Sequence, residues 1–201
     1  MSLINKKTNS LNELETKLNE LKLVDERYNI FSDLNHLSSI DENTEILIIG
    51  TYIPQDLDYF YFGKYSNRIY TCIDAARNTN FQERRKRILE VENYDIRTYL
   101  INEFIKELAN QHIAFLDLLE YTLIKDNEVS DNSIKAWFTE YDSIRKIINE
   151  ATSLEKIIPM SQASEEILID IIGNDDRIEY HQLINGETNQ EWVDLFQNNH
   201  E

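Results

Sequence analysis

Apolar and polar positions alternate along this chain in blocks that predict short buried strands separated by amphipathic helices. Continuous apolar runs over Glu45–Ile49, His112–Asp117 and Leu154–Met160 are typical of strands that are buried on both faces. Arg177–Ile184 is expected to form a fourth strand. Strands that alternate with helices pair in parallel, and right-handed crossovers place the helices on both faces of the sheet. The pattern therefore predicts an α/β fold, a three-layer α/β/α sandwich with a central, mostly parallel four-stranded sheet.

Apolar residues recur at helical spacing between these predicted strands. The first stripe lies in Ser10–Val24, which we interpret as an amphipathic helix that packs on the outside of the domain or against another subunit. Tyr28–Leu37 is predicted to be a short helical segment, Glu120–Asp131 a polar turn, and Ser133–Trp137 a brief strand or turn. The first 40 residues thus form an N-terminal helical segment on a domain of residues 41–201. Further helices are expected over residues 67–77, 81–91, 95–110, 142–151, 161–172 and 189–197.

Composition restricts the classes of protein to consider. The chain has 201 residues, of which 41% are hydrophobic and 28% are charged, as expected for one globular α/β domain. No apolar run approaches the roughly 18–20 residues that span a bilayer, and no apolar signal core follows the first lysines. Cys72 is the only cysteine, so an intramolecular disulfide and a Cys-rich zinc site are excluded. We expect a cytoplasmic protein that does not interact with membranes.

The charge distribution bears on nucleic-acid binding. A formal net charge of −17 opposes non-specific attraction to phosphates, because their neutralisation requires Lys and Arg. One segment, Lys64–Arg87, is nevertheless locally basic. Its run Arg84–Arg87 is either a phosphate-contacting patch or an ordinary solvated helix face. The candidate nucleic-acid contacts are Lys64, Arg68, Arg84, Arg85 and Arg87.

The stretch that follows the first predicted strand has the composition of a ligand site. Gly50 ends the strand, and a loop with Pro54 leads to the aromatic cluster Tyr59–Phe62 before a helix begins near Asn67. A buried strand that delivers a Gly/Pro loop to the next helix is how many α/β proteins bind ligands. Two other interpretations remain open: the aromatic cluster closes the top of the sheet, and Asn67 has a capping role in the first turn of the helix.

Two blocks of sequence carry the motifs of a known family. The first contains Gly50-Thr51, Pro54, the aromatic cluster and, after Gly63, Asn67-Arg68-Ile69-Tyr70. In the second, the apolar strand that ends at Asp117 precedes Ser130-Asp131-Asn132-Ser133-Ile134. Their order and spacing resemble the uracil-DNA glycosylase superfamily, most closely the branch of the mismatch-type and hypoxanthine-DNA glycosylases. The resemblance implies that residues 41–201 form a uracil-DNA glycosylase-like domain.

The resemblance also implies a chemistry and a set of residues. Cleavage of an N-glycosidic bond requires stabilisation of a departing anionic base, a positioned water, and an aromatic face for the extruded nucleotide. Asn67 matches a family position that activates water or recognises the base, and Thr51 and His181 are the other candidate catalytic residues. Asp117 is either a site carboxylate or a cap for the next turn. The candidate substrate-binding residues are Gly50, Tyr52, Tyr59, Tyr61, Phe62 and Asp117.

No metal ion and no cofactor is expected. The four histidines lack metal-ligand spacing, and the chain has no P-loop. Family members carry a Ser/Pro-rich loop that grips the DNA backbone, whereas residues 179–189 contain neither Ser nor Pro and include Glu187. Three functions stay open: a divergent glycosylase that removes a deaminated or damaged base from DNA, a pocket for a nucleoside, nucleotide or other small molecule, and a non-catalytic relative that acts through protein contacts or self-association of the Ser10–Val24 helix.

Overall fold

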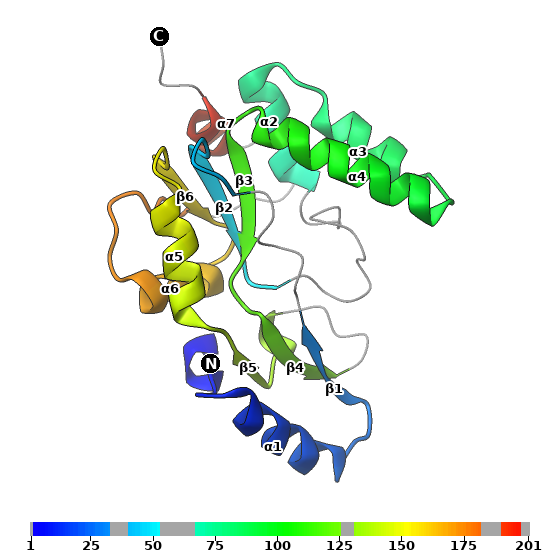
Figure 1. Cartoon of the computed structure of the whole chain (residues 1–201), viewed down its shortest axis with the longest axis vertical. Helices are drawn as coiled ribbons and strands as arrows, with labels where there is room; N and C mark the ends of the chain where they lie inside the picture. Colours follow the sequence, from blue (N-terminus) through cyan, green and yellow to red (C-terminus); the bar gives the residue numbers. More distant parts are fainter. Residues whose placement is uncertain (1, 33–39, 53–66, 126–130, 182–189, 198–201) are drawn as a thin grey trace.

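A parallel sheet of three strands forms the centre of the molecule (Figure 1). The computed structural model describes residues 2–32, 40–52, 67–125, 131–181 and 190–197. The three strands run in the order β3-β2-β6, and all the residues of β2 and β3 are buried, as their apolar runs predict. The bounds of these strands are β2, Ile46–Gly50; β3, Ile113–Asp117; and β6, Lys156–Pro159.

The predicted fourth strand of this sheet is wrong for the described residues. Ile178 makes one isolated parallel bridge with Ile157, framed by a bond from the Ile157 N–H to the Arg177 carbonyl at 2.8 Å. On both sides of this bridge the backbone bonds to side chains. The Arg177 N–H donates to Asp175 Oδ1 at 3.0 Å, and the His181 carbonyl accepts a bond from the Trp192 indole at 3.0 Å. The end of the predicted strand, residues 182–184, lies outside the described part of the chain.

Helices cover both faces of the parallel sheet, which confirms the predicted three layers. Alternate residues of β2 point to opposite faces. Ile46 and Ile48 pack in one core, and Leu47 and Ile49 pack in the other. The first core is covered by α2 (Asn67–Arg77), α3 (Phe81–Leu89), α4 (Tyr94–Ala109) and α7 (Gln190–Phe196). The second is covered by α5 (Tyr141–Glu150) and α6 (Gln162–Ile172), on the other side of the sheet in Figure 1.

A second, antiparallel sheet lies next to the parallel one, with the strand order β1-β4-β5. It corrects two predictions, since part of the expected helix at Tyr28–Leu37 and part of the expected turn at Glu120–Asp131 are strands. Neighbouring residues of these strands are buried on opposite faces, Leu123 in one hydrophobic cluster and Ile124 in another. The strands are short and carry polar residues beside their few apolar ones, and over so few positions the pattern fits a helix end or a turn equally well. The strands are β1, Tyr28–Ser32; β4, Tyr121–Lys125; and β5, Ala136–Phe138.

The first helix, α1 (Leu11–Lys22), covers the antiparallel sheet (Figure 1). Ser10 caps it by accepting a bond from the Glu13 N–H, and Leu14 is fully buried against Leu123 of β4. The apolar stripe of α1 is therefore used within this chain. Because β1 pairs with β4, the first 32 residues are part of the fold and not only a helical segment packed on it.

The N-terminal residues cross from one sheet to the other. The 3₁₀ helix η1 (Leu3–Lys6) offers the Leu3 carbonyl to the Trp137 indole at 2.8 Å, and Thr8 donates its N–H to the Trp137 carbonyl at 2.8 Å. Lys6 donates to the Ile134 carbonyl at 2.6 Å. These bonds tie β5, and the turn before it, to the start of the chain. No helix in the described part of the chain is long and apolar enough to cross a membrane.

Candidate functional site

The carboxyl ends of β2 and β3 lie side by side, and the first group of predicted site residues meets there. Gly50, the last residue of β2, is paired with Asp117, the last residue of β3. The residues that follow β3 form hydrogen bonds with the end of β2 and with the residue after it. The Leu118 N–H donates to the Gly50 carbonyl at 3.2 Å, and the Leu119 N–H donates to the Thr51 carbonyl at 2.8 Å. Thr51 thus begins the next segment from a fixed position.

Side chains from three distant segments join at this end of the sheet. The Thr51 hydroxyl donates to Asp131 Oδ1 at 2.7 Å, across 80 positions of sequence. The Ser161 hydroxyl, the N-cap of α6, makes a longer bond to Asp131 Oδ2 at 3.4 Å. Only Met160 separates Ser161 from the end of β6, and the Met160 N–H donates to the Ile49 carbonyl at 2.8 Å. Asp131 therefore connects the carboxyl ends of β2 and β6, and we call Thr51, Asp131 and Ser161 the hydroxyl–carboxylate bridge.

The electrostatics of this end are set by burial. Burial raises the pKa of Asp131 above its ordinary range, while its bonds to Thr51 and Ser161 and the nearby charge of Lys6 act in the opposite direction. Burial is also the main reason why the pKa of Lys6 is lowered, with a smaller contribution from Lys135. Asp117 is 1% exposed. The carboxyl end of the sheet thus concentrates two carboxyl groups in a region with little access to water.

Four predicted site residues come together here, and others are placed apart or lie outside the described residues. Gly50, Thr51, Tyr52 and Asp117 are all buried at this end of the sheet. Asn67 is the first residue of α2, which the β2–α2 connection reaches, and its side chain is not among those described. The predicted residues outside the described part are Tyr59, Tyr61, Phe62 and Lys64.

His181 lies beside α7 at the β6 edge of the sheet. Its Nδ1 is 3.5 Å from Glu191 Oε2, and the bridge at Ile178 is on the side of β6 away from β2. The structure therefore places β6 between this segment and the strand that delivers Thr51. His181 is not brought into contact with the hydroxyl–carboxylate bridge.

The three arginines of α3 have different surroundings. Arg84 pairs with Glu107 of α4, and Arg85 is 6% exposed beside the buried ring of Tyr70. Arg87 is mostly exposed and pairs with Glu83 at 3.2 Å. Arg68, in the first turn of α2, is half-buried. The predicted basic segment thus forms no continuous face within its described residues.

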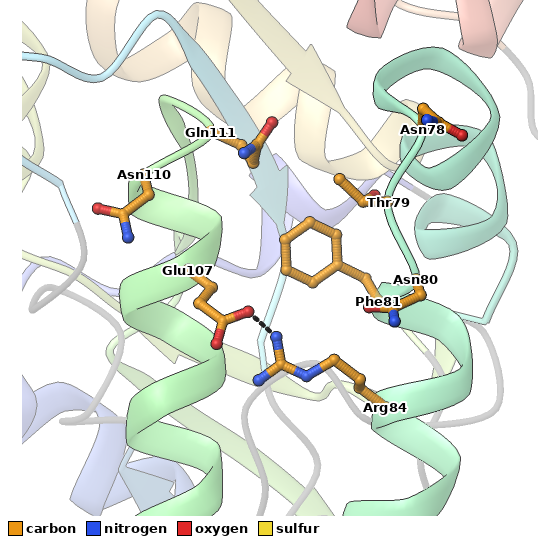
Figure 2. A pocket seen from close by; sticks show the side chains of 8 residues that line it. All are labelled: Asn78, Thr79, Asn80, Phe81, Arg84, Glu107, Asn110 and Gln111. Carbon is orange, nitrogen blue, oxygen red and sulfur yellow. Dashed lines mark ion pairs between the residues drawn. The ribbon is translucent and has the colours of Figure 1, made fainter.

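A surface hollow of about 380 Å³ lies near the other end of the sheet (Figure 2). Its walls come from the α2–α3 turn and the end of α4, and Gln111 on its rim precedes the first residue of β3 by two positions. Figure 2 shows amide side chains around it and the Arg84–Glu107 ion pair at its edge. Because parallel strands all begin at this end, the hollow is remote from Gly50 and Asp117 and does not belong to the site described above.

Two polar residues of the site were not among the predicted site residues. Asp131 lies in a motif block of the sequence, and Ser161 is the expected start of a helix after the third predicted strand. The carboxyl ends of parallel strands meet at one edge, so the first polar residue after each strand was an available signal for Ser161. Asp131 has no such signal, because it begins the short 3₁₀ helix η2 (Asp131–Ser133) and does not follow the end of a strand. Within the described residues, no group of His, Cys, Asp and Glu side chains is arranged to hold a metal ion.

Comparison with known proteins shows the fold. A solved structure of a candidate uracil-DNA glycosylase from Methanosarcina acetivorans, determined by NMR in solution, is similar to this chain with a TM-score of 0.50 and 17% sequence identity. The similarity covers 79% of this chain and 92% of that one. No protein-family model matches the sequence, and the search of curated proteins found no match. The chain therefore shares the fold of that protein.

Proposed function

We propose that this chain is a divergent DNA glycosylase that hydrolyses the N-glycosidic bond of a deaminated or damaged base, of the uracil or hypoxanthine type. One observation carries the proposal. Gly50 and Asp117 end adjacent parallel strands, and Thr51 leads from them into the connection to Asn67. Ligand sites in open parallel sheets lie at this edge. The fold shared with a candidate uracil-DNA glycosylase supports the same placement.

The proposed chemistry assigns each residue a limited task. Asn67 orients the attacking water or an edge of the base by hydrogen bonding, because an amide is not a base at neutral pH. Tyr61 or Phe62 stacks on the flipped base, and backbone N–H groups after Gly50 stabilise the charge that develops on it. Asp117, at 1% exposure, forms the floor of the pocket.

A base-release assay tests this proposal directly. Oligonucleotides with one uracil or one hypoxanthine are incubated with the wild-type chain, with Asn67→Ala and with the matched control Asn110→Ala. Asn110 lines the hollow near the amino ends of the strands, so its loss leaves the proposed pocket intact. We expect Asn67→Ala to lower the rate about 10²-fold, as removal of one site hydrogen bond does in other hydrolases. Equal release by wild type and Asn67→Ala contradicts the role of Asn67.

The DNA-binding part of the proposal is tested with salt. We propose that Lys64–Arg87 supplies the phosphate contacts, with Arg87 the most exposed arginine of α3. Because the chain carries a net charge of −17, we expect few phosphate contacts and a shallow dependence of affinity on salt. The measurement is a salt titration of binding to single- and double-stranded DNA. Absence of binding at low salt contradicts a DNA substrate.

A second function is favoured by one observation, the acidity of the chain. A net charge of −17, together with residues 179–189 that contain neither Ser nor Pro, suits a pocket for a free nucleoside or nucleotide better than a grip on DNA. Equilibrium dialysis with free uracil, hypoxanthine and their nucleosides separates the two functions. Binding of these small ligands without release of base from DNA supports the second function.

A further inference from the structure

We propose that Asp131 is a positioning residue that holds the Thr51 hydroxyl in one orientation at the mouth of the site. This inference rests on the proposed function, which places Thr51 in the base pocket. It assigns a task to a carboxylate that the glycosylase chemistry above does not use. The contacts of Thr51, the anchoring of Asp131 and the sequence separation of the two residues carry it.

Thr51 is held on two sides. Its carbonyl accepts the Leu119 N–H at 2.8 Å, and its hydroxyl donates to Asp131 Oδ1 at 2.7 Å. The residue is 8% exposed and follows the last residue of β2. The backbone bond fixes where the residue lies, and the side-chain bond selects one rotamer of its hydroxyl group. Without Asp131, only the first of these restraints remains.

Asp131 is itself anchored. Its second oxygen accepts the Ser161 hydroxyl at 3.4 Å, and its carbonyl accepts the Ile134 N–H at 3.4 Å. Ile134 is fully buried, and its carbonyl accepts Lys6 Nζ at 2.6 Å. The turn that carries the carboxylate is therefore attached to the second core and to the start of the chain. A rigid support of this kind is what a positioning group needs.

The bond between Thr51 and Asp131 belongs to the long-range hydroxyl–carboxylate bonds of the described residues, with those of Ser2 to Glu166 and of Tyr141 to Asp170, and it differs from the local ones. Thr79 donates to Asp74 and Thr44 donates to Asp41, at separations of five and three residues. Such short separations are typical of turns and helix starts, where the side chain satisfies the local backbone. Thr51 and Asp131 are 80 residues apart, so their bond is not required by any local turn.

The direction of the hydrogen bond has a chemical consequence. A hydroxyl has one proton and two lone pairs, and an ionised carboxylate only accepts. With its proton donated to Asp131, the Thr51 oxygen can only accept a bond from a ligand. It therefore suits the attacking water or an N–H of the base, and it does not suit a base carbonyl.

The test uses the full chain with Asp131→Ala, Asp131→Asn and the control Asp41→Ala. Asp41 bonds to Thr44 at the other end of β2 and lies outside the proposed site. The first measurement is hydrogen exchange of the Leu119 amide, which reports the position of Thr51 without any need for activity. We expect Asp131→Ala to speed this exchange about tenfold more than that of the central β2 amides, and Asp131→Asn to restore it, because the amide oxygen still accepts the hydroxyl.

The second measurement is kcat and KM for base release. We expect Asp131→Ala to lower kcat about tenfold to a hundredfold with little change in KM, Asp131→Asn to recover most of the rate, and Asp41→Ala to match wild type. Unaltered Leu119 exchange in Asp131→Ala overturns the positioning role, as does faster exchange with an unchanged kcat. Absence of base release from the wild type contradicts the proposed function instead, so the two failures are distinguishable.

Discussion

The two ends of β2 are built from similar residues and differ in how those residues are connected. At the amino end, Thr44 is 3% exposed and bonds to Asp41 within one turn. At the carboxyl end, Thr51 is 8% exposed and bonds to Asp131, a residue from a distant segment. Burial and residue type are thus nearly the same at both ends. The two ends differ in the sequence separation between the threonine and the aspartate to which its hydroxyl bonds.

This difference indicates which end of β2 has side-chain contacts that strand pairing alone does not require. At the amino end the long-range contacts align neighbouring strands, since the Glu45 N–H donates to the His112 carbonyl and the His112 ring bonds to the Asn43 carbonyl at 2.9 Å. These contacts start two adjacent strands. The carboxyl end instead gathers side chains after β2, in a separate turn and after β6, at the edge where parallel sheets bind ligands. We therefore propose that the carboxyl end of β2 is the functional one.

The largest effect on stability is expected in the middle of β2, because both ends of the strand depend on it. Ile48 is fully buried in the middle of β2. Ile48→Ala should lower the free energy of unfolding by about 2–5 kcal/mol, because it removes core contacts and leaves a cavity. Chemical unfolding measures the loss. We also expect slower base release per folded molecule at low temperature. Unchanged release would mean that the geometry of the carboxyl end does not depend on the packing of Ile48.

A smaller effect should separate the two ends. Thr51→Val removes a hydrogen bond to a partly buried carboxylate and should cost about 1.5–3 kcal/mol, whereas Thr44→Val should cost about 1 kcal/mol. Thr51→Ser and Thr44→Ser retain the hydroxyl and serve as the matched controls. Unfolding in urea at neutral pH gives the four values. Equal costs for the two valine substitutions would remove the distinction between a local and a long-range bond.

The pH dependence of stability should differ between the ends in a defined direction. The folded-state pKa of Asp131 is raised by burial, so its contribution to stability is complete below the pKa of the unfolded chain and is lost as pH rises through the folded value. The groups that act on it are Thr51, Ser161 and Lys6. Asp131→Asn should therefore gain stability relative to wild type as pH rises from 4 to 8.

Unfolding curves at several pH values test this direction. Asp41→Asn is the control at the amino end, and its difference from wild type should vary less with pH, because Asp41 is exposed to water. A stability of Asp131→Asn that falls relative to wild type as pH rises would mean that the carboxylate is stabilised in the folded chain and not destabilised by burial.

The smallest effect on stability is expected far from both ends of β2. Arg87→Ala removes an exposed ion pair with Glu83 and should change the free energy of unfolding by about 0.5 kcal/mol or less. If Arg87 contacts phosphate as proposed, the same variant should weaken DNA binding and reduce the salt slope by about one. Fluorescence anisotropy at several salt concentrations measures both. An unchanged slope would remove Arg87 from the proposed contacts.

The parallel half of the fold could be predicted from the sequence, and the antiparallel half could not. β2, β3 and β6 are short apolar runs between helical patterns, and such strands are identified by burial on both faces. β1 and β4 pack against α1 on one face and against the second core on the other, but each is five residues long and carries polar residues beside its apolar ones. So short a run does not distinguish a strand from a helix end or a turn. Their pairing joins residues 28–32 to residues 121–125, which no local pattern encodes.

The candidate site divides in the same way. The meeting of Gly50 and Asp117 follows from two predicted parallel strands whose ends must coincide, and Thr51 comes with Gly50. The bond from Thr51 to Asp131 depends on where a turn lies after the whole chain has folded. Side-chain contacts over 80 residues have no signature in spacing or periodicity. The strand ends of the site were therefore predictable, and the hydroxyl–carboxylate bridge was not.

One measurement tests the central claim most directly, that ligands are bound at the carboxyl end of β2. Backbone amide shifts of the labelled chain are followed by NMR during titration with an oligonucleotide that contains uracil or hypoxanthine. We predict changes at Gly50, Thr51 and the Leu118 and Leu119 amides that bond to them, with the signals of Asp41–Glu45 and His112 unmoved. Changes confined to the amino end, or to the amide-lined hollow of Figure 2, would contradict the account.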